Sequence, residues 1–495
     1  MMAARGLIAA ALAMSAWTSA QAAPFAAIVL PPPTAPGAAV QPYVRVPAGR
    51  IALTHVRLID GTGAAPQEDM VVLLDGARIA AVQSATAPIP VGVKIIDMTG
   101  RTILPGLVGM HDHMYYIGRP DLDAQGHSEP PLVVPQMTFT SPRLYLAAGV
   151  TTLRTTGSVE PYTDLNLKRQ IDAGAIPGPH VDVTGPYLEG ANSPFIQMHQ
   201  LRDAEDARRT VAFWADQGAT SFKAYMNITR AELGAAIAEA HRRGLKITGH
   251  LCAVTYPEAA ALGIDNLEHG FFVNTQNDPG KQPDRCSDGT GTPTLAGMTP
   301  GGPDATALIA LLVRHHVALT STLPVFEQSI PARAPLQPRA MEAMTPEARE
   351  AYLYARNARA LHPNPLFEKA YVNDLGLERQ FVAAGGLLLA GPDPTGNGGV
   401  VPGYGDQREV ELLVDAGFTP IEAIQISTLN GATFLGLADR IGTIAPGKDA
   451  DLIVVNGNPA ARIADIEHVE VTFKDGVGYD SAKLIQSVRG RYGEY

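Results

Sequence analysis

The middle of the chain alternates short apolar runs with longer amphipathic stretches. The apolar runs predict strands, and the stretches with apolar positions three and four residues apart predict helices. The predicted strands are 103–110, 150–153, 181–183, 221–226, 246–251, 266–272, 318–323 and 387–390. The predicted helices are 141–148, 163–173, 203–217, 229–243, 255–262, 304–316, 346–358, 373–384 and 405–416. This alternation predicts an α/β fold, namely a (β/α)8 TIM barrel, with an open doubly wound sheet as the alternative.

Both ends of the chain show a different pattern, in which short strands are separated by Gly and Asp turns. On the N-terminal side these runs are 51–60, 70–76 and 78–82, and on the C-terminal side they are 451–457 and 468–476. Such runs are typical of antiparallel strands with tight turns. We therefore expect the two ends to pair into one small β domain. The predicted domains are 51–104 (first part of the β domain, a β-sandwich by the resemblance described below), 105–436 (metal-dependent barrel) and 437–495 (second part of the β domain).

The first residues predict an export signal. Residues 1–22 contain one charge, Arg5, an apolar run over 6–14, and the small-x-small ending Ala20-Gln-Ala22. This is the pattern of a cleaved secretory signal peptide, and the apolar run is too short for a bilayer span. We expect a periplasmic or secreted protein in which 23–50 is a proline-rich linker.

Composition narrows the classes of partner and of metal site. The chain has 49 acidic and 38 basic residues and a net charge of −11, which argues against a nucleic-acid partner. Its 46% hydrophobic content predicts a globular chain. The two cysteines of the chain, Cys252 and Cys286, either form one disulfide or remain two buried thiols. They are too few for an all-thiolate zinc site.

Polar residues at the carboxyl ends of the predicted strands are the candidates for chemistry, because a barrel places its active site there. The first strand ends in His111-x-His113, and two residues apart on a strand puts both imidazoles on one face. The fifth and sixth strands carry His250 and His269, and Asp393 follows the eighth. Four histidines and one carboxylate on a single rim predict a metal site.

Lys223 on the fourth strand adds a further expectation. Alternation places Ser221, Lys223 and Tyr225 on one face of the strand. If this face points into the barrel, an ammonium beside metal ions would be desolvated and repelled, so the amine should be neutral. A neutral amine can react with carbon dioxide to give a carbamate, which is an anionic bridging ligand. The alternative is an outward lysine in a salt bridge.

These residues, together with the C-terminal part of the chain, resemble the amidohydrolase superfamily. That part reads Gly417-Phe-Thr-Pro-Ile-Glu-Ala-Ile, then Thr428-x-Asn430, then Ile441-Gly-Thr-Ile-Ala-Pro-Gly-Lys448-x-Ala-Asp451. The resemblance covers about residues 51–480. Within the superfamily the chain is most similar to the peptidase branch, which includes prolidase-like dipeptidases, Xaa-Arg/Lys carboxypeptidases and ochratoxinase-like amidases. The resemblance implies a barrel beside a small β-sandwich.

The resemblance also implies a dinuclear metal centre, with zinc as the expected metal. Its implied ligands are His111, His113 and Asp393 for the more buried ion, His250 and His269 for the more exposed ion, and Lys223, carboxylated by carbon dioxide, as a bridge together with a hydroxide. Asp393 is then the acid/base. Tyr225 is a candidate donor to the oxyanion, and the alternative for Tyr225 is a packing residue.

The chain departs from the family pattern at two places that bear on substrate binding. Many relatives read Val-Arg-Asp after the second strand, whereas this chain reads Leu153-Arg154-Thr155. The loop after the third strand lacks the Gly-Gly-His of some dipeptidases, and His199 is a candidate to replace that histidine or is an exposed loop residue. A substrate of this branch carries a free carboxylate, for which Arg154 and Arg202 are candidates.

The expected function is an exported dinuclear amidohydrolase that cleaves an amide bond of a small peptide or N-acyl amino acid. The oligomeric state stays open. The alternatives are a mononuclear deaminase or cyclic-amide hydrolase of the imidazolonepropionase type, a lactone or ester hydrolase, and a non-catalytic periplasmic binding protein. Loops 187–200, 274–303 and 324–345 are expected to determine side-chain specificity.

Overall fold

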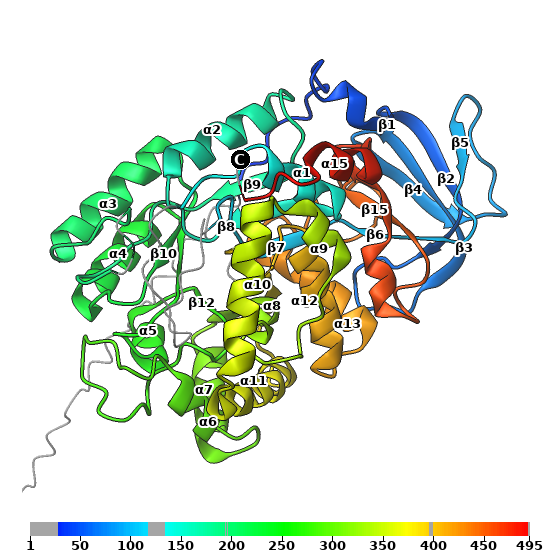
Figure 1. The fold of residues 1–495 in the computed structure, drawn as a ribbon. Coiled ribbons are helices and arrows are strands. Elements are labelled where there is room, and N and C mark those ends of the chain that lie inside the picture. The colour runs from blue at the N-terminus through cyan, green and yellow to red at the C-terminus, as the bar shows by residue number, and fades with distance from the viewer. Residues whose placement is uncertain (1–27, 117–133, 194, 196, 396–398, 494–495) are drawn as a thin grey trace, which may run out of the picture.

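The parallel strands of the middle region alternate with helices, as the sequence predicts. The computed structural model describes residues 28–116, 134–193, 195, 197–395 and 399–493, so the predicted signal peptide lies outside the described residues (Figure 1). One parallel ladder contains β7 (Leu107–Asp112), β8 (Val150–Thr155) and β9 (His180–Val183). A second contains β10 (Ser221–Ala224), β11 (Lys246–Gly249), β12 (Asn266–Glu268), β13 (Ala318–Ser321) and β14 (Leu388–Ala390).

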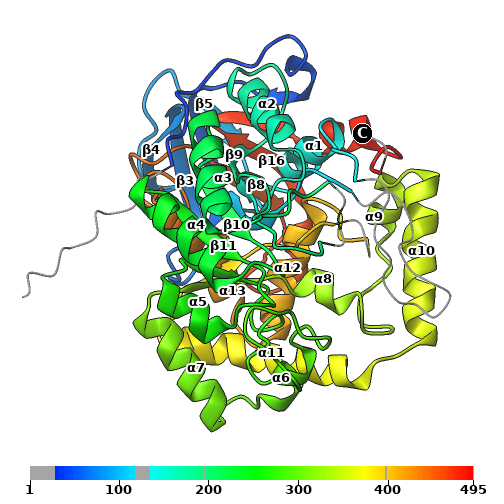
Figure 2. The same ribbon diagram turned by 90° about the vertical axis from the view of Figure 1, so that its left-hand side faces the viewer.

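Helices follow every one of these strands. They are α1 (Thr140–Ala147), α2 (Pro161–Asp172), α3 (Ala204–Gln217), α4 (Arg230–Arg242), α5 (Tyr256–Leu262), α6 (Thr292–Gly297), α7 (Pro303–Arg314), α8 (Leu323–Glu327), α9 (Pro338–Ala343), α10 (Pro346–Leu361), α11 (Pro365–Ala383) and α12 (Tyr404–Asp415). After α12 come α13 (Pro420–Gln425), α14 (Gly431–Phe434) and, at the end, α15 (Ser481–Val488). Figure 2 shows α3, α4 and α5 on the outer side of β10 and β11.

The two parallel ladders touch at both of their edges without forming one continuous ladder in the described chain. An isolated parallel bridge joins Thr184 to Ser221, next to β9 and β10. At the other edge the N–H of Asp393 donates to the carbonyl of His111 over 3.0 Å. Gly391 lies against the backbone of His111, where a Cβ would clash, so a glycine is required for this approach. The described chain therefore has the predicted α/β character, with eight parallel strands in two separate ladders.

The first predicted strand, 103–110, is two strands in the structure. Residues up to Pro105 belong to β6 (Arg101–Pro105) of the antiparallel sheet, and β7 begins at Leu107 in the parallel ladder. The break falls at Pro105-Gly106, because proline has no N–H for a ladder and glycine lets the backbone approach Thr151. Apolar periodicity alone did not separate the two strands.

Both chain ends contribute to one nine-stranded sheet, at the right of Figure 1. Its strands are β1 (Val44–Val46), β2 (Gly49–Leu58), β3 (Gln67–Gly76), β4 (Arg78–Ser84), β5 (Lys94–Asp97), β6, β15 (Leu452–Asn456), β16 (Val469–Lys474) and β17 (Val477–Asp480). The pairing of β15 with β6 and of β1 with β17 confirms that the ends associate. The pairings are antiparallel except that β2 runs parallel to β5 and β6. Leu53 and Val72 from one end and Leu452 and Phe473 from the other share one apolar cluster, so both halves enclose a common core.

The proline-rich segment before β1 packs on the parallel strands instead of linking two bodies freely. Leu30 is buried in a cluster with Val108, Leu389 and Phe434. Further along, the N–H of Gly37 donates to the carbonyl of Gly174 over 2.8 Å. The interpretation as a linker was therefore wrong for these residues, since apolar contacts on both sides of the prolines hold the segment in place.

The two long irregular stretches contain short helices that periodicity did not predict. Helix α6 lies within 274–303. Helix α8 lies at the start of 324–345, and α9 lies within that stretch. Each has a proline in its first turn, which is a start signal for a helix too short to show a periodic face. In the part of the chain that the structure describes, none of the helices combines the length and the apolar character needed to cross a bilayer.

Cys252 and Cys286 form a disulfide that ties the end of β11 to the 274–303 stretch. Of the two alternatives left open by the sequence, the structure has the disulfide. The enclosed loop spans 34 positions. This bond lies two residues after His250, so it restrains the backbone beside the candidate metal ligands.

The variant Cys252→Ser/Cys286→Ser is expected to lower the free energy of unfolding by about 3 to 4 kcal/mol. The reason is the larger entropy of an unfolded chain without a closed loop of this length. Urea denaturation of the oxidised protein and of the double variant measures the difference, and reduced wild-type protein should behave like the variant. A difference below about 1 kcal/mol would show that the bond contributes little.

Candidate metal and active site

Four histidines converge at the carboxyl ends of the parallel strands. The ring of His111, on β7, lies 5.3 Å from that of His113 and 4.6 Å from that of His269, measured between centroids. The ring of His250 lies 4.5 Å from that of His269. His111, His113 and His269 are buried and His250 is half-buried. Residues separated by up to 158 positions in sequence thus share one site, as the strand-end argument predicts.

Asp393 lies among these histidines. Its Oδ1 is 3.1 Å from Nε2 of His113 and 3.5 Å from Nε2 of His111, and its Oδ2 is 4.0 Å from Nδ1 of His269. His111, His269 and Asp393 each present a ligand atom within 4.8 Å of the others. Nε2 of His269 and Oδ1 of Asp393 are buried and have no hydrogen-bond partner in the described part of the chain. A cation would satisfy both atoms, so the donor set fits a metal.

Burial keeps the histidines in the form that binds metals. Desolvation lowers the pKa of His113 to about 4 and that of His250 to about 3. Both imidazoles are therefore neutral near pH 7, with a lone pair available for a cation.

Two of the candidate ligands have a left-handed backbone. His269 has φ 69° and Asp393 has φ 55°, each just after a strand. Non-glycine residues pay about 1 to 3 kcal/mol in unfavourable backbone regions, and such residues cluster at functional sites. The turn lets each side chain point back toward His111 instead of continuing the alternation of its strand.

Lys223 points into the cluster. Its Nζ is 3.1 Å from Nε2 of His111, and the side chain is 1% exposed. Desolvation lowers the pKa of Lys223 to about 8, which brings the neutral amine within reach near neutral pH. The alternative of an outward lysine in a salt bridge does not fit this geometry.

Glu268 is a part of the site that the sequence analysis missed. Its Oε2 is 2.7 Å from Nδ1 of His111, and its Oε1 accepts a hydrogen bond from Nη2 of Arg154 over 2.8 Å. Thr248 also contacts Oε1. The carboxylate holds His111 so that its Nε2 faces Lys223 and Asp393, and outer carboxylates of this kind orient metal-binding histidines. The available signal was a carboxylate directly before His269, at the end of a short buried strand.

The structure corrects the expectation that Arg154 binds a substrate carboxylate. Arg154 is 1% exposed, and besides Glu268 it donates to the carbonyl of Met110 over 2.6 Å and to Asn266 over 2.8 Å. Its guanidinium is therefore engaged beneath the histidines. A buried charge of this size needs such a partner, and Glu268 supplies it.

Three tyrosines line the side of the cluster next to Lys223. The ring of Tyr225 lies 4.8 Å from that of His250 and 4.9 Å from that of Tyr187. The hydroxyls of Tyr187 and Tyr115 are 2.9 Å apart. Burial raises the pKa of Tyr225 well above its ordinary value, so its hydroxyl keeps its proton and can donate it in a hydrogen bond. This fits both open interpretations of Tyr225; Tyr115 and Tyr187 were not predicted.

His199 and Arg202 lie apart from the histidine cluster in the contacts they make. Nε2 of His199 is 3.2 Å from Oδ2 of Asp206, and Arg202 pairs with the same carboxylate over 3.1 Å. Their side chains are 51% and 71% exposed. His199 borders a cavity of about 370 Å³ whose wall also includes Tyr187 and Trp214. The exposed position of His199 agrees with the alternative that it is a loop residue. The guanidinium of Arg202 is already paired with the carboxylate of Asp206.

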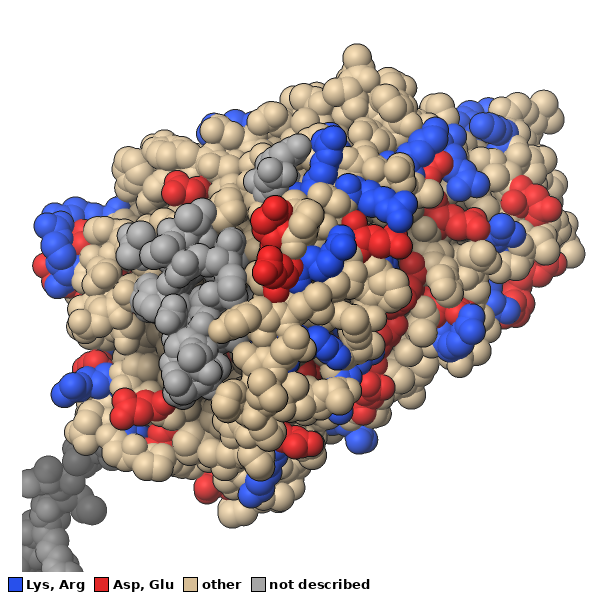
Figure 3. Space-filling view, viewed as in Figure 1, with Lys and Arg blue, Asp and Glu red and all other residues tan. Residues whose placement is uncertain are grey.

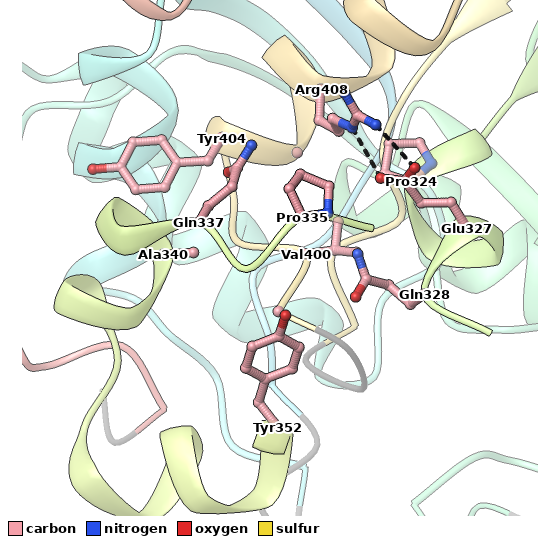
Figure 4. A pocket seen from close by; sticks show the side chains of 12 residues that line it. Pro324, Glu327, Gln328, Pro335, Gln337, Ala340, Tyr352, Val400, Tyr404 and Arg408 are labelled. Atoms are coloured by element: carbon pink, nitrogen blue, oxygen red, sulfur yellow. Dashed lines mark hydrogen bonds and ion pairs between the residues drawn. The ribbon is translucent and has the colours of Figure 1, made fainter. Parts of the chain in front are cut away.

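A second pocket lies among the segments that follow β13 and β14 (Figure 4). Its lining includes Pro335 and Gln337 from the 324–345 stretch, Tyr352 from α10 and Tyr404 from α12. At one side, Arg408 pairs with Glu327 through distances of 2.9 and 3.0 Å. One of the loops expected to determine specificity therefore does border a pocket.

Comparisons with known proteins agree with this architecture. The model of the amidohydrolase family matches residues 404–477. An adenine deaminase of Ligilactobacillus salivarius is 43% identical over 67 residues, which are 14% of this chain and 11% of that protein. The chain thus matches about a tenth of the length of this curated relative.

Solved structures match over nearly the whole chain. The putative prolidase from Bifidobacterium longum has a TM-score of 0.63 and 24% identity, covering 90% of this chain and 100% of that one. The ochratoxinase of A. niger has a TM-score of 0.61 and 18% identity, covering 88% and 96%. The amidohydrolase family model thus matches the C-terminal segment 404–477, and the solved structures, at 24% identity and below, show a shared fold over nearly the whole chain.

Proposed function

We propose that the protein is an exported, dinuclear metal-dependent hydrolase that cleaves an amide bond of a small peptide or N-acyl amino acid. The observation that carries this proposal is the position of Lys223. A buried amine with its pKa lowered to about 8, 3.1 Å from His111 and within the set of histidines, is placed to become a carbamate. A mononuclear deaminase would leave this amine without a metal to bridge.

His111, His113 and Asp393 would hold one ion, His250 and His269 the other, and carboxylated Lys223 both. When bound, two divalent ions, with zinc expected, polarise the scissile carbonyl and lower the pKa of water toward neutrality. Asp393 takes the proton of the attacking water and passes it to the leaving nitrogen. Tyr225 donates a hydrogen bond to the carbonyl oxygen as negative charge develops there.

The substrate class rests on the structural neighbours. A Xaa-Pro dipeptidase and a bottromycin amidohydrolase, whose names refer to peptide and amide bonds, share the fold of this chain at 20% identity. A small-molecule substrate also agrees with the surface, because acidic and basic side chains are interspersed on the face in Figure 3. Export is supported by the Cys252–Cys286 disulfide, since disulfides persist in oxidising compartments.

Metal analysis and hydrolysis assays test this function together. We expect that changing His113 and His250 to alanine, one ligand of each ion, removes two ions per chain and abolishes hydrolysis of dipeptides and N-acyl amino acids. Inductively coupled plasma mass spectrometry counts the ions. The control His362→Ala changes an exposed histidine and should alter neither property. Loss of only one ion, with activity on a purine or cyclic amide instead, would favour the deaminase.

A further inference from the structure

Three side chains meet at the opposite ends of the parallel strands, beside the antiparallel sheet. His180 is the first residue of β9, Asp451 directly precedes β15, and Asp475 lies in the turn between β16 and β17. Nε2 of His180 is 3.4 Å from Oδ1 of Asp475 and 3.6 Å from Oδ2 of Asp451. His180 and Asp451 are 1% exposed as side chains and Asp475 is 12% exposed.

The atoms that face one another are the ones without hydrogen bonds. Nε2 of His180, Oδ2 of Asp451 and Oδ1 of Asp475 have no hydrogen-bond partner among the residues that the structure describes. The other carboxylate oxygens are engaged: Oδ1 of Asp451 accepts from the N–H of Asp475 over 2.7 Å, and Oδ2 of Asp475 lies 3.1 Å from Nζ of Lys474. Each carboxylate is thus fixed by one oxygen and directs the other toward the imidazole.

We propose that His180, Asp451 and Asp475 form a structural site for a divalent cation of the zinc type. Two donors that bind zinc at about 2.0 to 2.2 Å in a tetrahedral arrangement lie about 3.3 to 3.6 Å apart, which matches the measured separations. One imidazole and two carboxylates are ligands that zinc accepts. The contact of Lys474 with Asp475 is the kind of outer hydrogen bond that orients a ligating carboxylate.

The charges at this site favour a cation. Burial lowers the pKa of His180, so the imidazole is neutral and free to bind a metal. Two carboxylates and one ammonium, that of Lys474, meet at this buried position. Asp449 and Asp172 lie nearby, but Asp449 is paired with Arg78 and Arg440, and Asp172 is paired with Lys168. A divalent ion would therefore compensate the second carboxylate of the site.

The position of the site, between β9 and the antiparallel sheet and next to a surface pocket, agrees with a structural ion. Asp475 and Lys474 line a surface pocket together with Asp172 and Tyr479, which gives an ion and a water ligand a path to the site. His180 comes from the parallel strand β9, whereas Asp451 and Asp475 lie next to the C-terminal strands of the antiparallel sheet. An ion here would bind the folded arrangement and not the unfolded chain, so it would stabilise the packing of β9 on the sheet.

The test uses the full chain with the His113→Ala and His250→Ala changes, which remove ions from the histidine cluster. We expect one zinc ion per chain to remain after dialysis, and zinc to raise the melting temperature of the stripped protein. Adding His180→Gln or, as a milder change, Asp475→Asn should weaken zinc binding at least tenfold in isothermal titration calorimetry. Asparagine tolerates the left-handed φ of 51° at position 475, so this variant should fold.

A partly buried His–Asp pair elsewhere in the chain provides the control. His241 lies 3.0 Å from Asp265, and His241→Gln should leave zinc binding unchanged. Equal zinc binding with and without the His180 change would overturn the proposal. Absence of bound zinc would also overturn it. If the pH midpoint of unfolding then shifts in His180→Gln, a proton shared by the three side chains takes the place of the ion.

Discussion

Lys223→Met is expected to lower kcat/KM for the hydrolysed amide at least about a thousandfold, while the protein stays folded. A thousandfold loss corresponds to about 4 kcal/mol of transition-state stabilisation, within the range that metal ions supply to a developing charge. Methionine fills nearly the same volume and removes an amine whose burial lowers its pKa, so the free energy of unfolding should be unchanged or higher. Steady-state kinetics and thermal denaturation measure the two effects.

Lys223→Ala distinguishes a bridging carbamate from a positioning lysine. Truncation at Cβ leaves room for a small carboxylate such as acetate or propionate, which supplies two oxygens in place of the carbamate. We expect these acids to restore part of the activity and of the metal content in Lys223→Ala, but not in Lys223→Met, where the side chain occupies the space. Rescue by methylamine instead of by carboxylates would contradict the carbamate.

The residues that could be predicted from the sequence are those placed by strand alternation and by the ends of strands. His111, His113, His250 and His269 follow short apolar runs, and the parallel arrangement brings all such ends to one rim. Alternation also groups Lys223 with Ser221 and Tyr225 on one face of its strand but leaves the direction of that face open, and the structure shows Lys223 next to His111. These inferences need the order and direction of the strands, but no knowledge of loop conformation.

The residues that escaped prediction depend on contacts between side chains. The pairing of Arg154 with Glu268 joins residues 114 positions apart, and periodicity says nothing about which charge meets which. The positions of His199 and Arg202 depend on the loop after β9, and there Asp206 holds both. The division at Pro105-Gly106 depends on which sheet each half joins, which is a property of the assembled fold.

Glu268→Gln should weaken metal binding about 10- to 100-fold and lower the free energy of unfolding by about 3 to 5 kcal/mol. The first effect follows from the loss of the carboxylate that orients His111, and the second from leaving the Arg154 guanidinium buried without its counter-charge. Competition with a chromophoric chelator measures the affinity, and urea denaturation of metal-free protein measures the stability.

The double variant Arg154→Met/Glu268→Gln separates the two roles of Glu268. Removing both charges should recover most of the stability, because no uncompensated ion remains, whereas the metal affinity should stay low. The charge of Arg154 and the hydrogen bond of His111 outweigh burial and hold the pKa of Glu268 at about 2, below its ordinary 4.5. A depressed carboxyl pKa contributes stability above about pH 4.5 that is lost as the pH falls toward 2. The stability difference between wild type and Glu268→Gln should therefore be constant from pH 8 to 5 and shrink below that; a difference that stays constant to pH 3 would mean that the charge of Glu268 does not stabilise the fold.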